Sequence, residues 1–489
     1  MLLFGALMLA AATASASMTA CGTSGSGDAE GTGTAAGAES DTAALETAAD
    51  RYGDALPDTL DFGGKAFRVA TYNGGNLTNG DGWFNYLDVE ETNGDVLNDA
   101  AYERNAEVEE RLNVDITCLE IAEWGQVLGA VQKSVSAGDD AYDIAIEASH
   151  ASYVNLISSN MLYDANELTY IDFSQPYYTR SSYETYEMDG HRYLFSGTYT
   201  YPLFSGVYWL FNKDMWTEYD LGDAYQTVRD GKWTVDTAFS YLKGTYIDVN
   251  GDSKHDVGDK YGFSTSPAML NYMYLGMGMK GVIPGADGFS YDYEDERAVD
   301  VVTKIIGWRE SSEAFYADSN QWANFFDGNS LMLLYGSSLP KLRDLDFDFG
   351  FLPMPKFDEA QKDYASYMCG GLVCIPTTIS DPDCVGATVE ALFSASGRIL
   401  EPAYLEKFVE NKVLRDEGSV EMYRLMLETA SYDFTRYISP NARVQNFGLI
   451  GTLIQKKSTD IASEWAKIEK NVKADFEEFH DEFVANTDG

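Results

Sequence analysis

The sequence predicts an α/β fold, and three observations support this class. Short β-branched and aromatic strands alternate with amphipathic helical segments between residues 66 and 146, the pattern of a parallel sheet covered on both faces. The length of 489 residues allows two or three domains. At Tyr201–Asp214, Pro202 stops regular structure, a buried-strand composition follows, and Asn212-Lys213-Asp214 ends it. We expect this stretch to cross from one α/β lobe to a second; a core strand of one large domain is the alternative.

The N-terminal half predicts three strands, at residues 66–72, 114–119 and 141–146. Asn98 or Asp99 can cap the first intervening helix, whose apolar residues share one stripe: Leu97, Ala101, Val108 and Leu112. The second helix is marked by Trp124, Val127, Val131 and Val135.

Polar side chains follow two of these strands. Tyr72 and Asn73 end the first strand, and Glu147 and His150 follow the third. In parallel sheets ligands bind beyond the carboxyl ends of the strands, so we expect these residues at a ligand site.

The C-terminal half continues the alternation. Thr234 should cap a helix, and Ala298, Val301, Val302 and Ile305 line another. Residues 331–335 form a buried strand that ends at Gly336 and Ser337, and residues 367–376, with Gly370-Gly371, form a return crossing. Further helices are expected at residues 385–396, 402–411, 419–428 and 461–483.

Composition restricts the partners. The formal net charge is −44, from 34 Lys and Arg against 78 Asp and Glu, which disfavours nucleic acid and anionic lipid surfaces. Aromatic residues make up 13% of the chain, a chemistry suited to sugars, although many must form core. Cys118, Cys369, Cys374 and Cys384 allow three disulfide pairings or four free thiols, and the sequence does not choose among them.

The first residues predict a lipoprotein. Residues 1–20 are apolar and then small, a signal peptide, and Met18-Thr19-Ala20 before Cys21 form a lipobox in which Cys21 would be lipidated. No Lys or Arg precedes Arg51, so a start upstream of Met1 stays open. Residues 21–57, rich in Gly, Ser, Thr, Ala and acid, predict a disordered tether. An ordinary cleaved signal with an accidental Cys is the alternative.

The segment Asp248–Asp259 has the spacing of a calcium loop. Such loops supply oxygen ligands at positions 1, 3, 5, 9 and 12 and a backbone carbonyl at position 7. The corresponding residues are Asp248, Asn250, Asp252, Asp256 and Asp259, with the carbonyl of Lys254. Ser253 replaces the glycine of the sharp turn. We expect a structural Ca²⁺, with an acidic Asn-Gly turn as the alternative.

Catalytic motifs are mostly absent. The sequence has no HExxH, no G-x-S-x-G and no Walker A loop, and its four His are scattered. A secreted glycosidase needs only two carboxylates at the right separation, so this class remains the enzyme alternative.

Several motifs together resemble the extracellular solute-binding proteins of bacterial ABC importers, in the sugar-binding, maltose-binding-like group. They are the lipobox, the strands at 67–72 and 142–144, Val114-Asp115-Ile116, Leu210-Phe211-Asn212-Lys213-Asp214, Gly231-Lys232-Trp233-Thr234 and Phe326-Asp327-Gly328-Asn329-Ser330. The resemblance covers roughly Leu60 to the C-terminus. It implies a two-lobed periplasmic-binding-protein-like fold with discontinuous lobes joined by crossing segments. The lobes would be 58–202 with 372–432, and 203–371 with 433–489.

The resemblance also implies where the ligand binds. Glu147 to His150 lie where the family contacts sugar, and Tyr335-Gly336-Ser337 where it often places a stacking aromatic, although the Trp that usually follows the Gly is missing. The aromatic platform would come from Tyr335 or from Trp83, Trp209 or Trp322, and Ser205 and Gly371 lie on the crossings.

The sequence therefore predicts a non-enzymatic protein that is lipid-anchored on the extracellular face of a bacterial membrane. It would capture a carbohydrate, of oligosaccharide size, between two lobes and deliver it to an ABC permease. A surface glycosidase and a ligand-sensing lipoprotein without a transporter are the alternatives.

Overall fold

A computed structural model describes residues 51–487 except 73–86, 88, 122, 124, 148–151, 201–205, 286–287, 319–321, 337–338 and 369–370. The chain divides into two compact units, Met1–Leu45 and Glu46–Gly489, and all described residues belong to the second. The predicted signal peptide, Cys21 and most of the predicted tether lie outside the described residues. None of the helices in the described ranges is long and apolar enough to cross a membrane.

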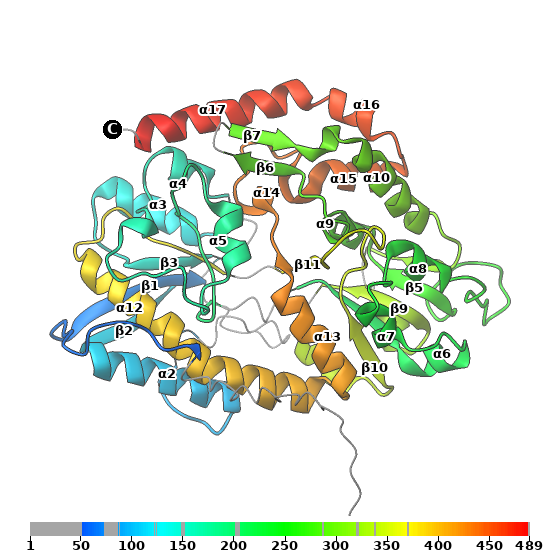
Figure 1. The fold of residues 1–489 in the computed structure, drawn as a ribbon, viewed down its shortest axis with the longest axis horizontal. Helices are drawn as coiled ribbons and strands as arrows, with labels where there is room; N and C mark the ends of the chain where they lie inside the picture. Colours follow the sequence, from blue (N-terminus) through cyan, green and yellow to red (C-terminus); the bar gives the residue numbers. More distant parts are fainter. Residues whose placement is uncertain are drawn as a thin grey trace, which may run out of the picture. The chain divides into compact units, whose positions relative to one another are not determined.

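The first sheet has four strands in the order β12-β3-β1-β2 (Figure 1). β1 (Lys65–Tyr72), β2 (Val114–Ile121) and β3 (Ile144–Glu147) are parallel, as predicted, and β12 (Leu372–Cys374) pairs antiparallel with β3. Side chains on one face pack in the same apolar cluster as α12 (Pro382–Ala395), and those on the other pack with α3 (Val127–Ala137). The sheet is thus covered on both faces.

The helix α2 (Val96–Leu112) begins earlier than predicted. Its cap is Asp95, whose carboxylate accepts the backbone N–H groups of Leu97 at 3.0 Å and Asn98 at 3.1 Å. Asp99 instead accepts the N–H groups of Asn93 and Gly94 in the preceding loop. The prediction of Asn98 or Asp99 was wrong because several polar residues here can each accept a backbone N–H, and the apolar stripe does not choose among them.

The second sheet has five strands in the order β10-β4-β9-β5-β8. They are β4 (Tyr208–Asn212), β5 (Tyr261–Thr265), β8 (Ala314–Tyr316), β9 (Ser330–Tyr335) and β10 (Phe349–Leu352). β5 runs parallel to β8 and β9, whereas β4 runs antiparallel to β9 and β10. Thr234 caps α8 (Val235–Ser240) as predicted, and its hydroxyl accepts the N–H of Thr237.

Helices cover this second sheet. α10 (Glu296–Arg309) buries the four predicted apolar residues, Ala298, Val301, Val302 and Ile305. The other helices of this half are α6 (Lys213–Glu218), α7 (Ala224–Arg229), α9 (Tyr272–Gly276), α11 (Ala323–Phe326) and α15 (Gly448–Lys456). A hairpin of β6 (Val282–Gly285) and β7 (Gly288–Tyr291) contacts the last helix, α17 (Glu469–Thr487), which also contacts α4 (Val154–Ser158).

Within the described residues, three of the segments that connect the two sheets pair with one another through backbone hydrogen bonds. At one end, Phe195 bridges Val373, and the Tyr153 N–H donates to the Tyr437 carbonyl. At the other, β11 (Ser366–Tyr367) pairs in parallel with β13 (Ala430–Ser431), and Gly206 bridges Met368. We call the described residues of the stretches 195–207, 366–373 and 429–437 the crossing segments; residues 201–205 and 369–370 lie outside the described ones. The predicted crossings at 201–214 and 367–376 overlap the first two.

One element lies in a different half from its predicted lobe. α13 (Glu417–Glu428) was assigned to the first lobe, which was to end at residue 432, but it packs on β10 and α7 of the second sheet. The chain reaches it from α12 through wide helical turns at Ser396–Leu400 and Ala403–Val413, which contact α2. Only tertiary packing decides this, since the apolar stripe of a helix does not reveal which sheet it covers.

Candidate functional site

The carboxyl ends of β1 and β3 lie side by side at one edge of the first sheet. Thr71 pairs with Ile146, which brings Tyr72 next to Glu147, and Glu147 pairs with Leu372 across the sheet. Glu147 is fully buried, whereas Tyr72 is partly exposed. The Tyr153 hydroxyl lies 3.3 Å from the Leu372 carbonyl and 3.5 Å from that of Glu147, so it joins the ends of β3 and β12.

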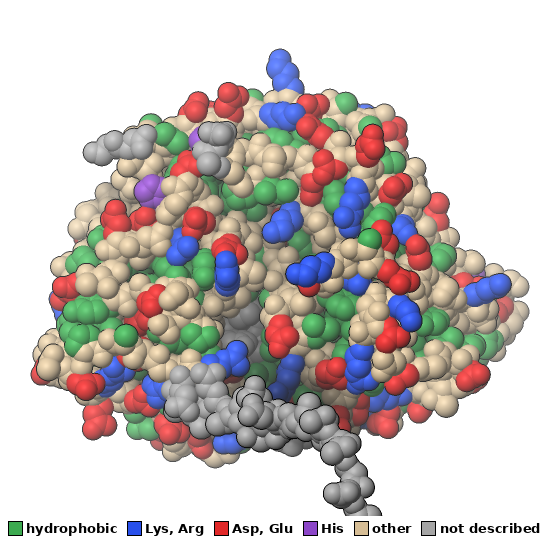
Figure 2. Space-filling model, in the orientation of Figure 1, with side chains coloured by type: hydrophobic (Ala, Val, Ile, Leu, Met, Phe, Trp, Pro, Cys, Tyr) green, Lys and Arg blue, Asp and Glu red, His purple; other side chains and the backbone are tan. Residues whose placement is uncertain are grey.

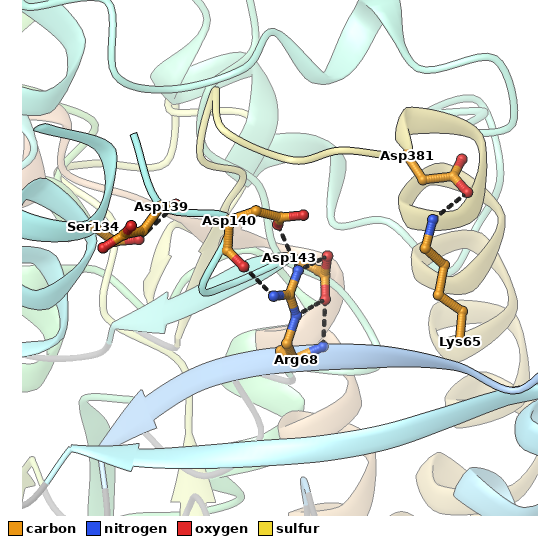
Figure 3. Close-up of polar contacts among 7 residues, drawn as sticks. All are labelled: Lys65, Arg68, Ser134, Asp139, Asp140, Asp143 and Asp381. Carbon is orange, nitrogen blue, oxygen red and sulfur yellow. Dashed lines mark hydrogen bonds and ion pairs between the residues drawn. The ribbon is translucent and has the colours of Figure 1, made fainter. Parts of the chain in front are cut away.

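An ion-pair cluster at the opposite edge sets this register (Figure 3). The Arg68 guanidinium donates to both carboxylate oxygens of Asp143, at 2.9 Å each, and to Asp140, and the Arg68 backbone N–H donates to Asp143 at 2.6 Å. The hydrogen bonds to Asp143 raise the pKa of Arg68. Because Asp143 immediately precedes β3, this contact fixes β3 against β1 and therefore holds Glu147 beside Tyr72.

The second sheet presents the end of β9 next to the first crossing segment. Tyr335 pairs with Tyr208, and the neighbouring Val207 donates its N–H to the Tyr367 carbonyl at 3.1 Å. Trp322 stands edge-on to Tyr335, with ring centroids 4.8 Å apart, and the Lys341 ammonium lies 6.0 Å from the Trp322 ring. Tyr335 is fully buried and Trp322 partly exposed, so Trp322 is the ring of this pair that a ligand can reach.

Trp209, a predicted ligand contact, lies in the hydrophobic core. It is fully buried in the middle of β4, and its indole N–H donates to the Met332 sulfur at 3.4 Å. Its ring packs against Trp233, Phe263 and Trp308, with centroids 5.2 to 6.0 Å away. Strand composition alone does not distinguish a core indole from one in a ligand site.

Gly371 lies in the second crossing segment, directly before β12. A Cβ at this position would come within 2.5 Å of the Ile146 side chain, so the glycine allows the segment to pack against β3. The predicted ligand residues Asn73, Trp83, His150, Ser205 and Ser337 lie outside the described residues.

The crossing segments carry polar and aromatic residues that sequence reasoning missed. The rings of Tyr272 and Tyr367 are tilted by 40° with their centroids 4.2 Å apart. The Arg436 guanidinium lies 5.9 Å from the Tyr367 ring and 5.4 Å from that of Tyr437. Asp433 is buried beside them and caps α14 (Phe434–Tyr437). The run Tyr432 to Tyr437 mixes three aromatic with three polar residues, a signal that could have marked this segment.

The predicted calcium residues lie on one loop. Asp248 accepts the N–H groups of Gly251 at 2.6 Å and Ser253 at 2.8 Å, and Asp259 accepts that of Val249 at 3.0 Å. Ser253 has a φ of 63°, the left-handed conformation of the glycine it replaces. Lys254 pairs with Asp252. Within the described ranges no three His, Cys, Asp or Glu side chains are gathered to hold a metal, so Ca²⁺ binding stays a prediction.

Two of the predicted disulfide candidates can be placed in the structure as thiols. Cys374 and Cys384 are buried free thiols, and Cys369 lies outside the described residues. Figure 2 shows acidic and basic side chains interspersed over the coloured part of the face it draws, without a continuous basic area.

The arrangement matches known structures across most of the chain. A cyclo/maltodextrin-binding protein complexed with maltotetraose is 14% identical and has a TM-score of 0.56, covering 88% of this chain and 98% of its own. An ABC substrate-binding protein from Listeria monocytogenes, in complex with cycloalternan, is 12% identical, with a TM-score of 0.52 and coverage of 84% and 98%.

A third similar structure is RafE from Streptococcus pneumoniae in its apo form, with 13% identity, a TM-score of 0.52, and coverage of 87% and 99%. The chain has the two-lobed fold of ABC substrate-binding proteins. At these identities the likeness establishes the fold. No protein-family model matches the sequence, and no curated protein matches it significantly.

Proposed function

We propose that this chain is the carbohydrate-binding component of a bacterial ABC importer. It would close on an oligosaccharide between its two sheet-bearing halves and deliver it to the permease without chemical change. The observation that carries the proposal is the set of three crossing segments, with the ends of β1, β3 and β9 beside them. Such a connection allows hinge motion, and a ligand contacted from both halves favours the closed state.

The residues at these strand ends suit a sugar. Partly exposed Trp322 supplies an apolar face for a pyranose ring, and Tyr72 supplies a hydroxyl at the opposing edge. The proteins of similar fold solved with maltotetraose and cycloalternan support carbohydrate as the ligand class.

Calorimetry against a panel of linear and cyclic oligosaccharides tests the proposal. At least one sugar should bind the wild-type protein, and Trp322→Ala should weaken it by about 1–3 kcal/mol through loss of a stacked ring. Tyr102→Ala, a change of an exposed aromatic on α2, is the control and should leave affinity unchanged. Binding of no sugar would refute the proposal.

The same samples address the enzyme alternative. After prolonged incubation, chromatography should return the bound oligosaccharide intact. Shorter products would instead favour a glycosidase.

Membrane attachment is the second part of the proposal. The lipobox supports diacylation of Cys21 on the extracellular face of the membrane. In a bacterial host, the wild-type protein should incorporate labelled fatty acid and fractionate with membranes, while Cys21→Ser should do neither. Labelling that survives the substitution would contradict the anchor. Co-purification with two permease subunits would separate import from sensing.

A further inference from the structure

A cavity of about 720 Å³ lies in the half of the molecule that carries the second sheet. Its walls come from the end of α7, from α13 and from residues 356–364. None of the predicted ligand residues lines it. It is thus distinct from the strand ends on which the proposed function depends.

Lys356 is the buried cation of this cavity. Its side chain is only 4% exposed, and its ammonium lies 5.2 Å from the centre of the Tyr364 ring. On another side it approaches Gly231, where an added Cβ would lie 3.3 Å from the ammonium nitrogen. Among the described residues no carboxylate lies within 4.0 Å of this nitrogen. A buried ammonium without a counterion strongly favours an anion that can reach it.

The other cations on the walls already have partners. Arg229 pairs with Glu421 at 2.5 Å, Lys362 with Asp363 at 3.8 Å, and Arg424 with Glu410. These three side chains are exposed, so their charges are screened by water. Lys356 is therefore the cation of these walls that has no carboxylate partner among the described residues.

The remaining walls are apolar and fixed. Val228 and Met422 are buried, and Val420 and Leu425 are half-buried. The Tyr364 hydroxyl donates to the Val228 carbonyl at 3.0 Å, which holds the ring across the cavity. At the exposed rim, Glu417 and Glu428 add negative charge that repels ligands with several anionic groups.

We propose that this cavity binds a small organic monocarboxylate with an apolar body. The carboxylate pairs with the Lys356 ammonium, and the body lies between the Tyr364 ring and the aliphatic wall. The rim acids exclude polyanions. No bond is made or broken, so this is a binding site for a second ligand class.

Benzoate is the probe, and benzamide, of the same shape but neutral, is its control. Calorimetry on the whole chain should show that benzoate binds and that benzamide binds at least about tenfold more weakly. Lys356→Met should weaken benzoate by at least about tenfold. Lys362→Met removes another lysine from the same walls and should leave the affinity within about twofold.

A crystallographic measurement keeps the test decisive if Lys356→Met does not fold. A wild-type crystal soaked with 4-bromobenzoate should show the anomalous bromine signal in this cavity, with the carboxylate at Lys356. The inference is overturned if wild-type protein does not bind benzoate, if benzamide binds equally well, or if the bromine lies elsewhere. Loss of affinity in Lys362→Met alone would also overturn it.

Discussion

At the scale of single residues, the third crossing segment contains Asp433, a buried carboxyl group whose surroundings disfavour its ionised form. The Asp433 carboxylate accepts hydrogen bonds from the Thr435 N–H at 2.9 Å and the Thr435 hydroxyl at 2.7 Å. Burial raises the pKa of Asp433 to about 7, against the lowering effect of these bonds and of Arg436. Asp292 raises it further, and burial also raises the pKa of Asp292 itself.

Asp433→Asn should change how stability depends on pH. Because the pKa of Asp433 is higher in the folded than in the unfolded state, the folded protein holds more protons between about pH 4 and pH 7. The free energy of unfolding of the wild type relative to the variant should therefore fall as pH rises through this interval, by at most about 1.4 kcal/mol per pH unit. Urea unfolding at several pH values measures it. Asp358→Asn, at an exposed site, is the control, and parallel profiles for wild type and Asp433→Asn would contradict the assignment.

Arg68 provides a second prediction at this scale. Arg68→Ala removes the guanidinium from Asp143, which is only 10% exposed, and should cost about 2 kcal/mol of unfolding free energy because the carboxylate loses charge-assisted hydrogen bonds. Arg180→Ala breaks the Arg180–Glu184 pair, in which both side chains are mostly exposed, and should cost less than about 0.5 kcal/mol. Equal losses in the two variants would show that the Arg68 cluster does not set the register.

At the scale of elements, those that depend on local interactions can be predicted from the sequence, whereas those that depend on pairing between distant residues cannot. Thr234 at a helix start and the buried strand β9 follow from local pattern, since cap and hydrophobic run act within a few residues. The crossing segments pair only through hydrogen bonds between distant parts of the chain, such as Met368 N–H to the Ser431 carbonyl at 3.2 Å. β11 and β13 have only two residues each, which is too short for a recognisable sequence pattern, so their pairing could not be predicted.

The Asp248–Asp259 loop tests whether local pattern also predicts metal binding. Calcium should stabilise the folded protein by about 3 kcal/mol at a hundredfold excess over its Kd, seen as a higher Tm than in EDTA. Asp256→Ala should remove this shift. Its backbone carbonyl takes the loop hydrogen bonds of Asp259 and Tyr261, so the change should leave the Tm in EDTA close to that of wild type. Identical Tm values for wild type in calcium and EDTA would contradict the calcium prediction.

At the scale of the whole molecule, thin connections join two sheets while one helix spans both halves. α17 contacts α4 and strand β7 of the hairpin, and one apolar cluster includes both Ala70 of the first sheet and Trp209 of the second. Motion between the halves must therefore rearrange the α17 contacts as well as bend the crossing segments.

Binding of an oligosaccharide should make the protein more compact. The ligand contacts both halves only when they approach, so the radius of gyration from X-ray scattering should fall at saturating ligand. For Trp322→Ala, measured at the same ligand concentration, the radius of gyration should fall less, because a smaller fraction of the variant protein has ligand bound. Superimposable curves for wild type with and without bound ligand would contradict closure.

The sequence by itself determined the α/β class, the strands of the first sheet and the helix with buried Ala298 to Ile305, because these depend on local periodicity. It also predicted two-lobed organisation through its resemblance to solute-binding proteins. Tertiary structure alone decided that Trp209 lies in the core, that α13 covers the second sheet, and that Lys356 is buried without a counterion among the described residues. Burial and pairing of this kind arise from contacts between residues far apart in the chain, and no window of sequence contains them.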